Sequence, residues 1–146
     1  MEIETRLFLI CHAPLASSFH GVACHAFGQR LNDAVAIDVL SHHSREQVAE
    51  LIEEAWLAAG SPSQVLLLTD LMGATPCNGA SLWMGRSKDN LQIAGIAGMS
   101  LPLLLKALTY KPLMPAELAE HLLRSQADCG CRLEAISARV PPQHQQ

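Results

Sequence analysis

The stretch RLFLICHAPLA, residues 6–16, decides the fold because it joins a buried strand directly to a helix. The apolar residues from Leu7 to Cys11 follow one another without a polar break, which is typical of a strand covered on both faces of a parallel sheet. His12 stands where this run ends. Pro14 then suits the first turn of a helix, where its missing N–H is not needed. The stretch therefore predicts a strand that presents an imidazole at the edge of a sheet.

Strand and helix patterns alternate along the rest of the chain. Short apolar runs predict strands at residues 34–39, 64–70 and 91–98, and residues 131–137 are a candidate last strand. Apolar stripes and end signals predict helices over 14–30, 44–59, 78–85 and 115–127, with a short one after Pro102. This order predicts an α/β fold, a doubly wound and mostly parallel sheet with helices on both faces.

Composition and charge limit the class of protein. The chain has 146 residues, of which 49% are hydrophobic and 16% charged, so we expect a single domain over residues 1–139, with residues 140–146 as a disordered tail. An acidic start, five cysteines without a repeated framework and no long apolar run predict a cytoplasmic protein that does not enter a membrane. The net charge of −4, dispersed over both signs, argues against nucleic acid as a partner.

His12 and Asp70 end the first and third predicted strands. Ligands of open α/β sheets bind outside the carboxyl ends of strands where the strand order reverses, so these two side chains converge if their strands are neighbours. The loop that follows, DLMGATPCN at residues 70–78, leads into a helix. Gly73, Ala74 and Thr75 leave their backbone N–H groups accessible, and the helix adds a positive dipole end. The sequence therefore predicts an anion site here.

Each of these residues also has an ordinary interpretation when it is taken alone. His12 could be a surface residue after a strand, Asp70 a cap at a strand end, and Gly73 a turn residue. The convergence of His12 with the loop favours a functional role for both over these ordinary interpretations.

His20 and Cys24 have a spacing that could place two metal ligands on one helix face. No second pair completes a tetrahedral site, so we predict no metal.

Three segments together resemble a known family. They are the strand-ending histidine with HAPLA, the loop TDLMGATPCNGAS at 69–81, and AGMSLPLLLKAL at 97–108. They are similar to the IIA components of the mannose class of sugar phosphotransferase systems, which includes fructose-type members. The family's loop usually reads Asp-x-x-Gly-Gly-Ser/Thr-Pro-x-Asn. The chain matches it at Asp70, Gly73, Thr75, Pro76 and Asn78, and departs from the family pattern at Ala13, Ala74 and Ser100.

The resemblance implies that His12 accepts a phosphoryl group from the histidine phosphocarrier protein HPr and donates it to a IIB component. Asp70 would accept a hydrogen bond from Nδ1–H of this histidine and leave Nε2 as the nucleophile. The loop residues Gly73, Ala74, Thr75 and Asn78 would bind the phosphoryl group, and no metal or cofactor is required. The resemblance also implies a homodimer, in which residues 131–137 form an antiparallel strand on the partner's sheet.

Two other functions remain open at this stage. One is a regulatory protein-binding module that uses the same phosphohistidine as a signal, and the other is the phosphotransfer subunit of a dihydroxyacetone-kinase system. The loop GATPCN looks more like the mannose class than the kinase subunit. We expect regulation rather than transport, because the loop departs from the family pattern at Ala74 and the chain ends soon after its last predicted strand.

Overall fold

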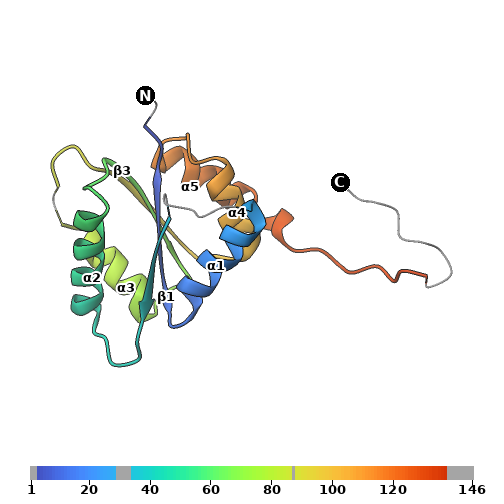
Figure 1. Cartoon of the computed structure of the whole chain (residues 1–146), viewed down its shortest axis with the longest axis horizontal. Helices are drawn as coiled ribbons and strands as arrows, with labels where there is room; N and C mark the ends of the chain where they lie inside the picture. Colours follow the sequence, from blue (N-terminus) through green and yellow to red (C-terminus); the bar gives the residue numbers. More distant parts are fainter. Residues whose placement is uncertain (1–2, 29–33, 87, 138–146) are drawn as a thin grey trace.

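The computed structural model describes residues 3–28, 34–86 and 88–137, which form one parallel sheet covered by helices (Figure 1). Its strands are β1 (Arg6–His12), β2 (Ala34–Val39), β3 (Gln64–Thr69) and β4 (Gln92–Ala97). They lie in the order β2-β1-β3-β4, and all three pairings are parallel. The predicted doubly wound α/β fold is confirmed. The strand order reverses between β1 and β3, so the strands that carry His12 and Asp70 are neighbours.

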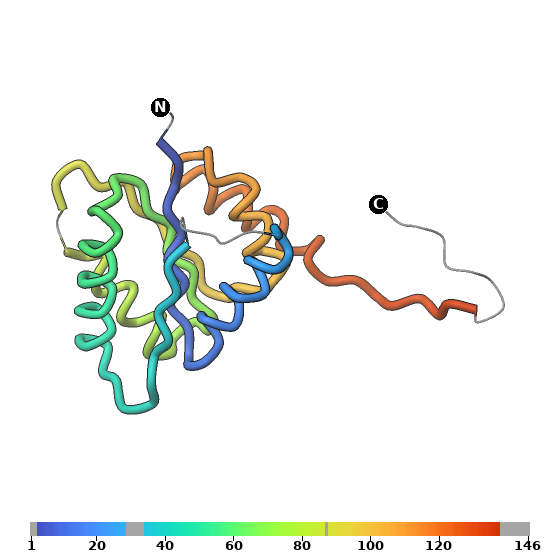
Figure 2. The backbone as a smooth tube through the Cα atoms, viewed as in Figure 1, coloured from blue at the N-terminus to red at the C-terminus, as the bar shows by residue number. Residues whose placement is uncertain are grey.

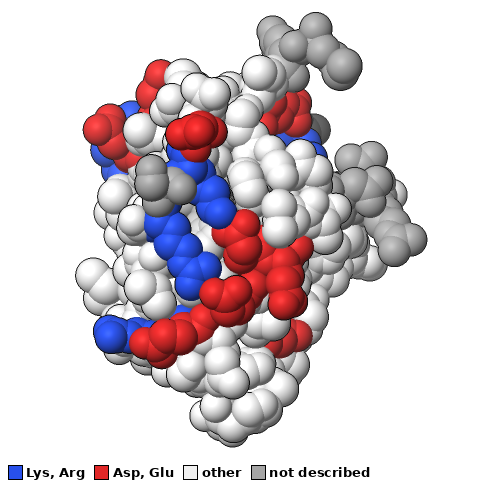
Figure 3. Space-filling model, turned by 90° about the vertical axis from the view of Figure 1, so that its left-hand side faces the viewer, with Lys and Arg blue, Asp and Glu red and all other residues white. Residues whose placement is uncertain are grey.

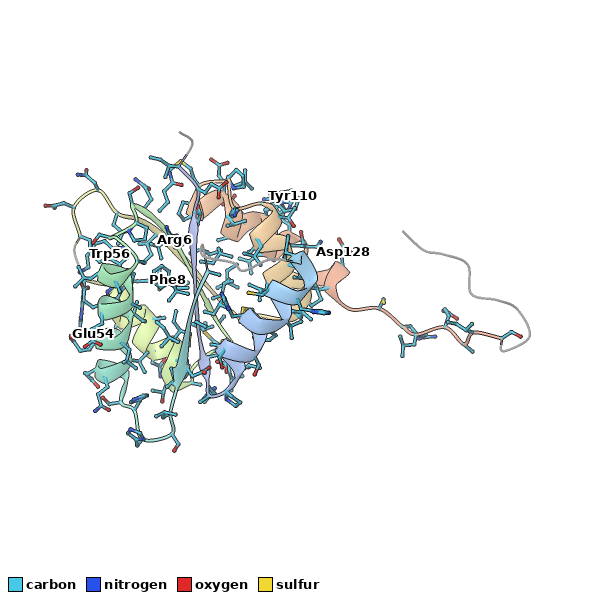
Figure 4. The ribbon with its side chains drawn as sticks, in the orientation of Figure 1. Arg6, Phe8, Glu54, Trp56, Tyr110 and Asp128 are labelled. Carbon is cyan, nitrogen blue, oxygen red and sulfur yellow. The ribbon has the colours of Figure 1, made fainter. Side chains whose placement is uncertain are left out.

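The helices cover the two faces of the sheet in separate layers (Figure 1). One layer contains α1 (Leu15–Phe27), α4 (Leu101–Thr109) and α5 (Pro115–Arg124), and the other contains α2 (Arg45–Ala58) and α3 (Thr75–Met84). Alternate residues of β1 supply both cores, because successive side chains of a strand point to opposite faces. Leu7 and Leu9 pack with the first layer, whereas Phe8 packs with the second, where Trp56 of α2 lies against the same core (Figure 4).

Local end signals place several helix boundaries differently from the sequence prediction. α1 ends at Phe27 because Gly28 takes the left-handed conformation, with φ of 67°, and its N–H bonds to carbonyl groups of the last turn. The predicted end at residue 30 was therefore too late. α3 begins at Thr75, not at Asn78, with Pro76 in its first turn. The helix predicted over 115–127 ends at Arg124 and is followed by the short 3₁₀ helix Gln126–Cys129.

The capping box of α2 is confirmed. Ser44 Oγ accepts from the backbone N–H of Gln47 at 3.1 Å, and Gln47 Oε1 accepts from the N–H of Ser44 at 2.8 Å. α2 also packs very closely on α3. A Cβ added at Gly79 of α3 would lie 2.4 Å from two side-chain carbons of Val48. Only a glycine permits this approach without a shift of one helix.

The outer face of this layer carries charges of both signs next to one another (Figure 3). Arg86 bonds to Glu50 at 3.0 Å, and Lys88 pairs with Glu53. The same Lys88 ammonium lies 4.9 Å from the ring centroid of Trp56. These pairs join the segment after α3 to α2. The face in view therefore offers no uniformly basic surface of the kind that nucleic acid binding needs.

Residues 131–137 form no strand in the single chain. They run away from the body of the molecule (Figure 2), and all of their side chains are exposed. The exposed fraction is 90% for Leu133 and 76% for Ile136. The exchange of this segment into a second copy stays a prediction. The predicted disordered tail, 140–146, lies outside the described residues, and none of the helices described is both long enough and apolar enough to cross a membrane.

Candidate functional site

His12 and Asp70 are in direct contact at the carboxyl edge of the sheet. Ile10 of β1 pairs in register with Thr69 of β3, so His12, two residues after Ile10, ends its strand close to Asp70. The Nδ1 atom of His12 is 2.8 Å from Oδ2 of Asp70. The backbone N–H of His12 donates to the same oxygen at 3.0 Å. One carboxylate oxygen therefore fixes both the main chain and the ring of the histidine.

The electrostatics of this pair define which ring nitrogen carries the proton. Burial alone would raise the pKa of the Asp70 carboxyl, but the hydrogen bonds from the ring and backbone of His12, with the charge of its ring, outweigh it and lower this pKa below its ordinary value. Asp70 is thus ionised at neutral pH and can only accept a hydrogen bond. In the neutral imidazole the proton must sit on Nδ1, which leaves the lone pair on Nε2.

The two side chains differ strongly in exposure. The side chain of His12 is 51% exposed, whereas that of Asp70 is 11% exposed. The second carboxylate oxygen, Oδ1, is buried and has no hydrogen-bond partner among the described residues. The pair therefore combines an accessible ring with a largely buried carboxylate that accepts its hydrogen bond.

The loop after Asp70 is shaped by backbone conformation and by two hydrogen bonds. Gly73 has φ of 82°, in the left-handed region that favours glycine. Asn78 Nδ2 donates to the carbonyl of Gly73 at 3.1 Å, and the N–H of Ala74 bonds to the carbonyl of Leu71 at 3.3 Å. The contact with Gly73 gives Asn78 a role in holding the loop. The phosphate-binding role that the family resemblance implies for Asn78 stays a prediction.

The N-terminus of α3 lies at the same edge as His12. Its N-cap is Ala74, which has no side-chain acceptor, and its first turn, beginning at Thr75, contains no acidic residue. The first N–H groups of a helix have no acceptor within the helix, and the helix dipole gives this end a partial positive charge. The anion site at Gly73, Ala74 and Thr75 stays a prediction that this helix end would favour.

Three apolar side chains close in sequence to His12 or Asp70 are exposed at the surface. Leu71 is 59% exposed and Met72 is 78% exposed, and both follow Asp70 directly. Leu15, the first residue of α1, is also exposed. Exposed apolar side chains of this size next to a reactive group suit contact with another protein, whose arrival would remove them from water.

Cys11 and the pair of His20 and Cys24 are the other reactive side chains singled out near the first strand. Cys11 precedes His12, but burial, with the charges of Asp70 and Asp38, raises the pKa of its thiol to about 12. Such a thiol is protonated and inert at neutral pH. The sulfur of Cys24 is 3.8 Å from Nδ1 of His20, and within the described ranges no group of three or more possible metal ligands occurs.

One polar contact at this edge was not predicted from the sequence. Asp38, near the end of β2, accepts a hydrogen bond from the backbone N–H of Ser17 through Oδ1, at 3.1 Å. Asp38 stands opposite Cys11 in the parallel register. The only sequence signals were an acidic residue at a strand end and a helix that begins without a capping side chain of its own.

The fold and the His12–Asp70 pair together define an α/β domain with an accessible imidazole at the carboxyl edge of its sheet. Comparison with known families identifies the class of protein. Residues 6–123 match the family described as the PTS system fructose IIA component, where PTS is the sugar phosphotransferase system. The chain therefore belongs to this family of phosphotransfer carriers, as the sequence resemblance indicated. No curated protein matches the chain significantly.

Solved structures share the fold at low sequence identity. The mannose/sorbose-specific IIA subunit of Enterococcus faecalis is 22% identical, with a TM-score of 0.75, over 92% of this chain and 98% of that one. The component EIIA of Streptococcus agalactiae is 18% identical, with a TM-score of 0.77, over 88% and 96% of the two chains. A sigma-54 interaction domain protein of Enterococcus faecalis is 14% identical, with a TM-score of 0.73, over 88% and 95%. At these identities the likeness shows the fold alone.

Proposed function

We propose that this chain is a phosphohistidine carrier in which Nε2 of His12 accepts a phosphoryl group from an HPr-type protein and passes it to a second protein. The observation that carries the proposal is the 2.8 Å contact between His12 Nδ1 and Asp70 Oδ2, on a ring that is half-exposed. It fixes the tautomer that a nucleophilic imidazole needs and leaves the reacting nitrogen open to a partner.

The transfer balances without a further reactant. The lone pair of Nε2 forms a bond to phosphorus as the phosphorus–nitrogen bond of the donor's phosphohistidine breaks, and the electron pair of that bond returns to the donor's ring. The His12 ring then carries a positive charge, with Nδ1–H directed at the Asp70 carboxylate. Donation to the next protein reverses these steps.

The loop and α3 supply the remaining stabilisation. Phosphoryl transfer proceeds through a loose transition state, so the protein contributes mainly positioning and charge stabilisation. The backbone N–H groups of Gly73 and Thr75, with the hydroxyl of Thr75, would bind the phosphoryl oxygens. The N–H of Ala74 would join them on release from its long bond to Leu71, and Asn78 would hold the loop through its bond to Gly73. This route uses no metal and no cofactor.

The proposal is tested by phosphorylation in the cytoplasmic relay that it implies. Incubation with phosphoenolpyruvate, enzyme I and HPr should give an acid-labile, base-stable phosphohistidine on the chain, and His12→Ala should carry none. His121→Ala is a matched control, because His121 lies on α5 against the ring of Tyr110 and away from the loop. Label that persists in His12→Ala would refute the assignment, and so would its absence from the native chain with a competent donor.

The acceptor downstream is either a IIB component, in sugar transport, or a regulatory target. The fold is compatible with both, because the similar structures include a mannose/sorbose-specific IIA subunit and a sigma-54 interaction domain protein. Affinity capture from native cells with wild-type and His12→Ala chains distinguishes them. Phosphorylation-dependent recovery of a IIB protein, with sugar uptake lost in the variant strain, supports transport. Recovery of other targets with uptake intact supports regulation.

We further propose a homodimer in which residues 131–137 add an antiparallel strand to the outer edge of β4 in a second copy. β4 is an edge strand, and an unpaired edge invites strand addition. A groove of about 140 Å³ lies beside it, lined by apolar residues of β4 and α3 that include Met84 and Gly95. Leu133, the most exposed apolar side chain of the segment, could fill it, whereas Ile136, three positions later, would lie on the opposite face of the added strand.

Light scattering tests the dimer. The intact chain should have twice the monomer mass at micromolar concentration, and a variant that ends at Gly130 should be a monomer. The single change Leu133→Glu should also give a monomer if this side chain enters the groove. A monomeric intact chain, or a dimer that survives the truncation, would contradict the exchange.

A further inference from the structure

Helix α1 begins without a capping side chain from its own segment. Its N-cap is Pro14, which has no side-chain acceptor. Asp38 of β2 takes this role from outside the helix, because its Oδ1 accepts from the N–H of Ser17 at 3.1 Å. Ser17 is the third residue of α1, the position that an N-cap side chain normally bonds. A carboxylate there also complements the positive end of the helix dipole.

This contact lies on the segment that joins His12 to α1. The N–H of Ala13 donates to the carbonyl of Val39, the residue after Asp38, at 2.9 Å. The carbonyl of Pro14 in turn accepts from the Ser17 hydroxyl at 3.1 Å. Two consecutive residues of β2 therefore hold both the backbone just after His12 and the first turn of α1. Asp70 holds His12 from the opposite side, on β3.

We propose that Asp38 is a positioning residue for His12, an inference that rests on the proposed phosphohistidine function. Its carboxylate anchors the first turn of α1 and, through Pro14 and Ala13, the backbone that sets the direction of the His12 ring. Without this anchor the ring samples orientations in which Nε2 points away from the loop at Gly73. Asp38 itself does not touch the reacting atoms.

The test compares Asp38→Ala with Asp38→Asn in single-turnover transfer from phosphorylated HPr. Asp38→Ala should lower the limiting rate on the order of tenfold, since small displacements of a reacting group cost rates of this size. The donor concentration that gives half the limiting rate should change less than the rate does, because Leu71 and Met72 keep their places on the loop after β3 and only Leu15, in the first turn of α1, is displaced. Asp38→Asn should restore most of the rate, since an amide oxygen caps a helix about as well as a carboxylate.

Ser44→Ala is the matched control for general loss of stability. It removes a cap of the same kind, the 3.1 Å bond to the Gln47 N–H at the start of α2, from the other layer of the fold. It should lower the melting temperature about as much as Asp38→Ala and leave the transfer rate unchanged. Equal slowing in both variants would overturn the inference. A wild-type rate in Asp38→Ala, or an Asp38→Asn variant as slow as Asp38→Ala, would overturn it as well.

A second readout separates this inference from the proposed function. If the native chain accepts no phosphate, the proposed function fails, and the ¹⁵N resonances of the His12 ring decide the role of Asp38. Asp38→Ala should shift or broaden the Nδ1 resonance of His12, whereas Ser44→Ala should not. An unchanged ring spectrum in Asp38→Ala would overturn the positioning role, whatever the result of the transfer assay.

Discussion

Asp70→Asn isolates the charge of Asp70 from its hydrogen bonds, because an amide oxygen still accepts from His12. Full unit charges 2.8 Å apart attract by about 3 kcal/mol at an effective dielectric constant of ~40, and by about 1.5 kcal/mol at the value of water. We use this range because the His12 side chain is 51% exposed. The loss of this attraction in the transition state should slow transfer by roughly tenfold to a hundredfold.

The assay is single-turnover transfer from phosphorylated HPr, with circular dichroism as a check on the fold. Thr75→Val provides a graded comparison. It removes one hydroxyl from the loop and keeps the backbone donors, so it should slow transfer less than Asp70→Asn does. An unchanged rate in Asp70→Asn would remove the carboxylate charge from the mechanism, and a larger effect in Thr75→Val would place the main stabilisation in the loop instead.

The lowered pKa of Asp70 also predicts how stability depends on pH. A carboxyl whose pKa is lower in the folded than in the unfolded chain stabilises the fold above its unfolded pKa, and this stabilisation is lost as the pH falls through the folded pKa. The free energy of unfolding of the wild type should therefore fall more steeply than that of Asp70→Asn as the pH is lowered below ~4. Parallel profiles for the two proteins would refute this assignment.

Two further predictions concern packing and thiol chemistry. Gly79→Ala should lower the free energy of unfolding by about 1–2 kcal/mol, because overlap with Val48 outweighs the gain in helix propensity. Gly21→Ala, whose Cβ meets nothing within 4 Å, should raise it by up to ~1 kcal/mol. Urea unfolding measures both free energies, and equal effects of the two changes would contradict the close approach of α2 and α3. In the native chain the exposed Cys131 should react with a thiol reagent at pH 8 within minutes. Cys11, whose thiol has a pKa of about 12, should react only when the chain unfolds. Mass spectrometry of the labelled residues measures both reactions.

The first strand and its histidine could be predicted from the sequence because the physics is local. An unbroken apolar run reports burial on both faces, and the rule for ligands of α/β sheets then places His12 and Asp70 at one edge. The order β2-β1-β3-β4 bears this out, since it makes the two strands neighbours. A local signal, the left-handed preference of glycine, also marks the end of α1 at Gly28. The apolar stripe alone predicts a helix that continues to residue 30.

Contacts between distant segments could not be predicted in this way. The bond from the Ser17 N–H to Asp38 joins a helix to a strand 21 positions later in the chain, and no pattern within either segment specifies it. The same holds for residues 131–137. An alternating pattern indicates that a segment suits a sheet, but a strand also requires a free edge to pair with, and the location of that edge is a property of the whole assembly.

Ala74 replaces the glycine that is usual at this position of the family loop, and the structure shows why it is tolerated there. Its φ of −85° is accessible to any L-residue, whereas the neighbouring Gly73, at 82°, occupies the conformation that favours glycine. As the N-cap of α3, alanine also leaves the first N–H groups of the helix without a side-chain acceptor. The substitution therefore keeps these donors available to an anion.

Ala74→Asp should separate stability from transfer. An aspartate at this N-cap supplies the missing acceptor and complements the helix dipole, so it should raise the free energy of unfolding by about 1 kcal/mol. The same carboxylate would bond the N–H of Cys77, the third residue of α3, and its charge would repel the phosphoryl oxygens bound beside it, so transfer to His12 should slow at least tenfold. Ala74→Gly is the control, since it restores the family residue without an acceptor and should leave the transfer rate unchanged. A chain that is stabilised by Ala74→Asp and still transfers at the wild-type rate would place the phosphoryl group away from the N-terminus of α3, on the opposite side of the His12 ring.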